Sequence, residues 1–131
     1  IKELDIQIPI VGGDSFAGQE VVESNYSDNV IYVLPKISIK DSFKQKINAL
    51  QGYENLQINI AAPLTYDATK IMLEAIKKAN SLDKEKIKNE LYNTSYLGES
   101  GSLIEFDEQG DLKNAEYEIK VIKNKKSFDY E

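Results

Sequence analysis

Ile8-Pro-Ile-Val-Gly-Gly-Asp-Ser-Phe16 joins an apolar run to the start of a helix through two glycines. The β-branched residues before the glycines predict a short strand, in which a proline is tolerated at an edge or at a strand end. These residues are Ile6, Ile8, Ile10 and Val11. Gly12 and Gly13 give the backbone access to angles closed to other residues, so we expect a sharp turn where the strand ends.

Asp14 follows this turn and has two interpretations. With Ser15 it is a candidate cap for a helix over residues 19–22. In open α/β sheets, however, ligands bind outside the carboxyl ends of the strands, and Asp14 stands at such an end. A carboxylate there either caps the helix or meets a cation. The local pattern alone favours the cap.

Composition excludes several classes of function. The chain has 131 residues, enough for one domain with a core, and 22 acidic residues against 16 lysines give a net charge of −6. This balance argues against nucleic acid as a partner and is typical of a soluble surface. The chain has no cysteine and no histidine, which excludes thiol chemistry, Cys/His zinc sites and a Ser-His-Asp triad. We expect no cofactor and no metal.

The first half predicts α/β units on a parallel sheet. Residues 30–34 form a continuous apolar run, typical of a strand covered on both faces. A helix follows, which we expect to start near Ser38 and to end before Gly52 as its C′ residue. Its apolar positions recur at helical spacing: Ile39, Phe43, Ile47 and Leu50.

The second half begins with the strongest helix pattern, over residues 66–80. Its apolar stripe comprises Ala68, Ile71, Met72, Ala75, Ile76 and Ala79. Ser81 or Asp83 starts another helix, whose inward positions we expect to be Leu82, Ile87 and Leu91. Beyond it we predict a flexible segment at 98–101, a strand at 103–106, a turn at 107–111, a half-exposed strand through 117–121, a turn at 124–126 and a last strand at 128–130.

Local motifs for other chemistry are weak. Asp107, Gly110 and Asp111 do not have the spacing of an EF-hand loop, and a polar turn explains them better. Gly12-Gly13 lacks the lysine of a P-loop and the third glycine of a dinucleotide loop. Carboxylates are plentiful, but nothing predicts which two would face each other for catalysis. Asp67 near the start of the 66–80 helix has a structural interpretation, favourable to the helix dipole.

Three passages together resemble the type I periplasmic binding proteins, most closely the branched-chain amino acid receptors of ABC transporters. The first is the Ile8–Ser15 stretch, in which a strand ends in a glycine pair and an acidic residue. The second is Tyr66-Asp-Ala-Thr-Lys-Ile-Met-Leu-Glu-Ala-Ile-Lys-Lys-Ala79. The third is Gly98-Glu-Ser-Gly-Ser-Leu-Ile-Glu-Phe-Asp-Glu-Gln-Gly-Asp111, similar to the hairpin that follows this helix in the family. Most of the chain is covered, in the family's order and spacing.

The resemblance implies two α/β lobes that close on a small ligand about a hinge. The family is two to three times longer, and the chain starts at Ile1 without methionine, so we expect the C-terminal part of a larger protein. Residues 1–62 would then be strand–helix units of the second lobe. Residues 63–113 would be helices and a β-hairpin that pack on the first lobe, and residues 114–131 would be closing strands of the second lobe. The fold class is thus a partial type I periplasmic-binding-protein fold.

The resemblance also implies a binding site and reverses the preference for a cap. In amino-acid-binding members, a carboxylate at the position of Asp14 receives the ligand's α-ammonium. Gly13 would let the backbone approach the ligand, and Ser15 or Phe16 would line the wall. Family members often have glycine where this chain has Ser15, so the shape of the wall is open. The groups for the ligand's carboxylate would lie on the first lobe, which leaves half a site here.

The function that follows is capture of a small amino-acid-like ligand outside the cytoplasm, in the periplasm or by a lipid-anchored protein, and delivery to the membrane subunits of an ABC transporter. A sensory domain of the same fold in a receptor or regulator is the main alternative, and a small acidic α/β enzyme is the weaker one. The apolar stripe of the 66–80 helix must be buried against another surface. We therefore expect the isolated chain to self-associate, for instance as a segment-swapped dimer.

Overall fold

The computed structural model describes residues 8–50, 52 and 58–130. Contacts within the chain divide it into two compact units. The first contains the described residues up to Lys36 together with those from Glu116 on, and the second contains Ile37–Ala115. The chain therefore passes between the units twice. The assignment of residues 1–62, 63–113 and 114–131 to two lobes stays a prediction.

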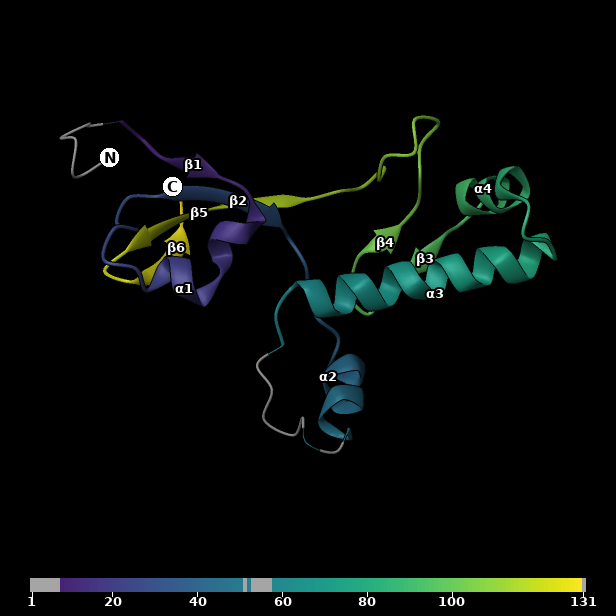
Figure 1. Cartoon of the computed structure of the whole chain (residues 1–131), viewed down its shortest axis with the longest axis horizontal. Helices are drawn as coiled ribbons and strands as arrows, with labels where there is room; N and C mark the ends of the chain where they lie inside the picture. Colours follow the sequence, from purple (N-terminus) through teal and green to yellow (C-terminus); the bar gives the residue numbers. More distant parts are fainter. Residues whose placement is uncertain (1–7, 51, 53–57, 131) are drawn as a thin grey trace. The chain divides into compact units, whose positions relative to one another are not determined.

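A four-stranded sheet forms the first unit (Figure 1), in the order β1-β2-β5-β6. The strands are β1 (Val11–Gly12), β2 (Ile31–Pro35), β5 (Tyr117–Lys123) and β6 (Lys126–Asp129). The β1–β2 pair is parallel, as predicted for the first half, whereas β5 is antiparallel to both of its neighbours. Asn124 and Lys125 both have positive φ, which suits the two-residue turn between β5 and β6. Ile6, predicted in the first strand, lies outside the described residues.

The two faces of this sheet differ in their cover. A short 3₁₀ helix, η2 (Asp14–Ala17), packs against β2 and is followed by α1 (Gln19–Val22). On the covered face Tyr32, Leu34 and Ile122 are buried. The pairing of Val33 with Ile119 and of Val121 with Phe128 places those side chains on the opposite face, where Ile119 and Phe128 are exposed. Burial along β2 alternates between buried and half-buried side chains, and Val121 is buried on the second face. The predicted cover on both faces is therefore only partial on the second face.

The second unit contains α2 (Asp41–Asn48), α3 (Ala61–Ala79), α4 (Lys84–Tyr92) and the hairpin β3 (Tyr96–Leu97) and β4 (Leu103–Ile104). The long helix starts at Ala61 rather than Tyr66, with Pro63 in its first turn, where a missing N–H costs nothing. Asn80 ends it in the left-handed conformation. The Asp83 carboxylate accepts hydrogen bonds from the backbone of Glu85 and Lys86, so Asp83 and not Ser81 caps α4.

The predicted apolar stripe of α3 differs from the set of residues that are buried. The buried row consists of Pro63, Asp67, Ile71 and Ala75, at intervals of four residues. This row forms one narrow face of the helix. α4 packs against α3, and the β3–β4 turn bonds to Asp67 of this row. Of the other predicted stripe residues, Ala68 and Met72 are exposed, and Ile76 and Ala79 are half-buried. Leu82, expected inward, is 86% exposed.

The Gly98–Gly101 segment is the clearest departure from expectation. We predicted it to be flexible, but it is the tight turn of the β3–β4 hairpin, and Gly98 and Ser100 are buried. The reason is Asp67, which lies inside α3 and accepts hydrogen bonds from the backbone of Glu99 and Ser100. The structural role of Asp67 is therefore to bind the backbone of this turn and not to interact with the dipole of α3. The downstream turn at 107–111 and the hairpin of β5 and β6 are confirmed.

The α2 helix is held mainly by one aromatic residue. Phe43 is 2% exposed, and its ring meets Tyr66 of α3 edge-on with 5.5 Å between centroids. α2 ends at Asn48, before the predicted end at Gly52, and Leu50 is exposed. No side chain caps its start, which corrects the Ser38 prediction.

Two isoleucines on β5 test whether the two faces of the sheet differ in cover. Ile122 is fully buried on the covered face, whereas Ile119 is 47% exposed on the other. Truncation of Ile122 to alanine removes buried methylene groups, so we expect a loss of about 2–5 kcal/mol in the free energy of unfolding. Ile119→Ala should cost about 1 kcal/mol or less, because much of the side chain is already in water. Urea unfolding of both variants measures the difference. Equal losses would contradict this difference in cover between the two faces.

Candidate functional site

The turn after β1 carries the residues predicted to bind a ligand, Gly13, Asp14, Ser15 and Phe16. Asp14 begins η2, and the Phe16 N–H donates to the Gly13 carbonyl at 3.1 Å. α1 starts one residue after Gly18, and neither η2 nor α1 has a side-chain cap. The interpretation of Asp14 and Ser15 as caps is therefore wrong. The extra 3₁₀ turn separates them from the helix they were expected to cap.

Asp14 and Ser15 are exposed. The Asp14 carboxylate makes no hydrogen bond and no ion pair with any residue among 8–50, 52 and 58–130. It therefore presents both oxygens to solvent at the carboxyl edge of the parallel β1–β2 pair. An unpaired carboxylate in this position can accept several hydrogen bonds from an ammonium group.

The two glycines have different roles from those expected. Gly13 has φ −90° and ψ −166°, and Gly12 has no positive φ either, so neither is required for its backbone angles. A Cβ on Gly12 would lie 1.7 Å from the Phe16 ring, which shows that this ring lies directly against Gly12. A Cβ on Gly13 would meet nothing within 4 Å. The backbone at Gly13 is thus open, while Phe16 packs against the turn and is half-buried.

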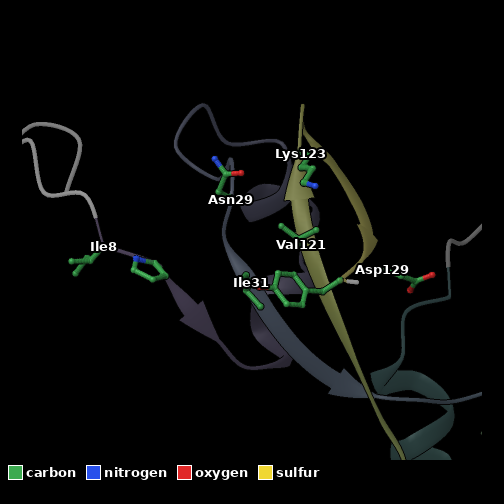
Figure 2. A pocket seen from close by; sticks show the side chains of 8 residues that line it. Ile8, Asn29, Ile31, Val121, Lys123 and Asp129 are labelled. Atoms are coloured by element: carbon green, nitrogen blue, oxygen red, sulfur yellow. The ribbon is translucent and has the colours of Figure 1, made fainter.

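A hollow of about 720 Å³ lies at the other end of the same sheet (Figure 2). Figure 2 shows Ile31 of β2 and Val121 of β5 on neighbouring strands, with Asn29 and Lys123 near the strand ends. Ile8, Pro9, Asp129 and Tyr130 complete the lining. The hollow flanks the residues that precede β1 and β2, whereas Asp14 follows β1. The sequence did not predict it, because it forms only where β5 and β6 lie beside the first two strands.

A second polar cluster lies in the second unit, around Glu99. The Ser42 hydroxyl donates to the Glu99 carboxylate at 2.7 Å, and the Lys46 ammonium forms an ion pair with it. These two contacts, the Lys46 hydrogen bond first, lower the pKa of Glu99 from its ordinary value. Lys46 also lies 5.3 Å from the centre of the Tyr66 ring. The cluster joins α2 to the β3–β4 turn and has no unpaired group poised for chemistry.

Two further observations concern the described residues. No three acidic side chains among them are grouped closely enough to hold a metal ion. No helix in this part of the chain combines the length and the apolar character needed to cross a bilayer.

The chain is similar to known ligand-binding proteins in sequence and in structure. The family model for the receptor family ligand binding region matches residues 7–125. The chain is 25% identical over 121 residues to the leucine-, isoleucine-, valine-, threonine- and alanine-binding protein of Pseudomonas aeruginosa. The crystal structure of the leucine-binding protein LivK from Thermotoga maritima superposes with a TM-score of 0.70 at 23% identity.

These matches cover almost all of this chain but only part of each relative. The alignment includes 90% of this chain and 32% of the Pseudomonas protein. The structural match includes 99% of this chain and 38% of the Thermotoga protein. The chain thus spans about a third of the length of the curated relative.

The glycine pair gives a test of the turn. Gly12→Ala places a methyl group where the Phe16 ring lies, so the ring must leave its position; we expect the free energy of unfolding to fall by about 1–3 kcal/mol. Gly13→Ala, its matched control, adds a methyl group in open space at backbone angles that alanine adopts, so its stability should be within about 0.5 kcal/mol of the wild type. Urea unfolding measures both. A Gly12→Ala protein as stable as Gly13→Ala would contradict the ring contact.

Proposed function

The chain belongs to the family of receptor ligand-binding regions, and on that premise we propose that it forms one side of an amino-acid-binding site in an extracytoplasmic solute-binding protein. The observation that carries this proposal is Asp14, an exposed and unpaired carboxylate directly after a parallel strand. Delivery of the ligand to the membrane subunits of an ABC transporter is part of the proposal.

The fold is that of the predicted family. The match to LivK over 99% of the chain agrees with the predicted partial type I periplasmic-binding-protein fold, and the resemblance to the branched-chain amino acid type is confirmed. The relatives are binding proteins rather than enzymes. This supports a binding function for the chain and leaves the ligand to be argued from the site.

The chemistry of the turn suits an α-amino acid. Its ammonium group would donate to the Asp14 oxygens, while the open backbone at Gly13 admits close approach. Ser15 adds an exposed hydroxyl beside them, and Phe16 supplies apolar surface at the edge of the turn. The turn has no cation to receive the ligand's carboxylate. That group is then bound by residues outside the turn, and the turn alone binds weakly.

The curated relative is described as binding leucine, isoleucine, valine, threonine and alanine. A ligand of this kind has a small apolar or hydroxyl-bearing side chain, and we propose the same class here. A protein that binds it would act outside the cytoplasm, either in the periplasm or anchored by a lipid.

A sensory role is the second candidate. The family model is named for receptor ligand-binding regions, and the same amino-acid site serves equally in the sensory domain of a receptor or regulator. The two candidates share the ligand and differ in the partner that senses the bound state.

The ammonium role of Asp14 is tested by titration calorimetry on the longest natural polypeptide that contains this chain, with leucine, valine, threonine and alanine as ligands. Asp14→Asn keeps the size of the side chain but removes its charge, and a charge-assisted bond is worth about 1.5–3 kcal/mol. We therefore expect affinity to fall about tenfold to more than a hundredfold.

Glu20→Gln is the matched control, since Glu20 is an exposed carboxylate on α1 of the same unit. The affinity of this variant should equal that of the wild type if Asp14 contacts the ligand directly. A lower affinity would indicate that the overall negative charge of the unit attracts the ligand. Unchanged affinity in folded Asp14→Asn would refute the assignment.

Self-association of the isolated 131-residue chain is a further part of the proposal. Large apolar side chains are exposed on both units, including Met72 and Leu73 on α3 and Tyr117 and Ile119 on β5. Apolar patches of this kind are rarely left in water, so a second copy of the chain is the expected cover, for instance in a segment-swapped dimer. Light scattering coupled to gel filtration should report a mass above 14.8 kDa that rises with concentration. A monodisperse monomer at high concentration would contradict this.

A further inference from the structure

Asp67 is a buried carboxylate that the proposed binding site does not use. It lies on α3 and has no exposed surface. Its Oδ1 accepts the Glu99 N–H at 2.7 Å, and its Oδ2 accepts the Ser100 N–H at 2.9 Å. Burial of a carboxylate is costly unless such bonds satisfy it, so the turn and the carboxylate require each other.

The turn is built to admit this carboxylate. A Cβ on Gly98 would lie 2.1 Å from the Asp67 Oδ2, so a larger residue at this position would displace the carboxylate. Gly101 has φ +81°, which favours glycine, and Ser100 is fully buried. The 98–101 turn therefore has the residues that let one side chain of α3 fix its backbone.

The same turn holds the segment by which the chain enters the second unit. The Ser38 N–H donates to the Ser100 carbonyl at 2.9 Å, and the Lys40 N–H donates to the Glu99 carbonyl at 3.0 Å. A Cβ on Gly101 would lie 2.3 Å from the Ser38 carbonyl oxygen, which shows how closely the two backbones approach. The residues whose N–H groups bind Asp67 are thus the residues whose carbonyls bind segment 38–40.

On the other side of the crossing, the chain is anchored in the first unit. The Lys36 N–H donates to the Glu116 carbonyl at 2.9 Å, and their side chains form an ion pair at 3.0 Å. Both exposed side chains are screened by solvent, so the backbone bond is the stronger part. Ile37 is the residue between the two anchors.

We infer that Asp67 is a positioning residue for this crossing: it fixes the 98–101 turn, and the turn fixes segment 38–40 on the second unit. Within the second unit, these contacts tie α3, the β3–β4 turn and segment 38–40 together. The anchoring does not depend on the proposed function.

Amide hydrogen exchange resolved by NMR tests the anchoring without any ligand. Asp67→Asn keeps one acceptor oxygen but turns an NH₂ group toward a backbone N–H, so the turn loses a charge-assisted bond. Exchange at Glu99, Ser100, Ser38 and Lys40 should become about tenfold or more faster. Amides of the first unit, such as Asn29 and Ile122, which bond to its sheet, should not change. Glu74→Gln, on the exposed side of α3, is the matched control and should leave all of these rates unchanged.

Lys40→Pro tests the order of dependence. Lys40 has φ −64° and ψ 143°, angles that proline adopts. The change removes the N–H bonded to Glu99 and puts the ring Cδ in the place of its hydrogen, so segment 38–40 must move away from the Glu99 carbonyl. It also removes the Lys40 ammonium that donates to the Leu97 carbonyl. Because Asp67 still binds the turn, Glu99 and Ser100 should keep their slow exchange.

Two outcomes would overturn the inference. In Asp67→Asn, unchanged rates at Ser38 and Lys40 would mean that the turn does not hold the segment. In Lys40→Pro, fast exchange at Glu99 and Ser100 would mean that the segment holds the turn. If Asp67→Asn loses protection from exchange everywhere, including at Asn29 and Ile122, the variant is unfolded. The exchange rates of Glu99 and Ser100 in Lys40→Pro then decide the question. Failure of ligand binding in the full polypeptide affects the proposed function and leaves these rates as they are.

Discussion

The second unit depends on a carboxylate that is completely removed from solvent. The backbone N–H groups of Glu99 and Ser100 donate the hydrogen bonds that compensate the Asp67 carboxylate for its lost hydration. α3, the β3–β4 turn and segment 38–40 meet at this point. Glu99 adds a second link, because its side chain binds Ser42 and Lys46 of α2. One helix residue therefore organises three elements that lie far apart in the sequence.

Periodicity predicted much of the fold because the relevant interactions are local. The long helix up to Ala79, the cap of α4 and the β5–β6 turn all follow from residues that contact near neighbours in the chain. The predictions failed where distant segments decide. The 98–101 turn is rigid because of Asp67, and its glycines indicate flexibility only when that contact is unknown. The buried row of α3 is likewise set by where α4 and the hairpin lie.

The candidate site was predictable in position and not in detail. The place of Asp14 after a strand follows from the order of residues, but the 3₁₀ turn that removes it from α1 does not. Gly12 is needed because the ring of Phe16, four residues later, lies against it, and no rule about glycine angles contains that information. The hollow lined by Ile31 and Val121 requires strands from both ends of the chain. The proposed ligand role of Asp14 comes from resemblance to a family, and the geometry adds that its carboxylate is unpaired among the described residues.

The charges on β5 explain why one face of its sheet has exposed apolar side chains beside the buried Val121. Glu118 and Lys120 point to the same face as buried Tyr32 and Leu34, and Lys120 is neutralised there by Glu118 at 2.9 Å and by Asp129 at 2.6 Å. Tyr117 and Ile119 point to the other face and are exposed. An ordinary half-exposed strand has the reverse arrangement, with charges outward. Because ion pairing makes the polar side chains compatible with the covered face, the sequence leaves the other face free for apolar residues. Such side chains are suited to burial, which is the physical basis of the proposed self-association.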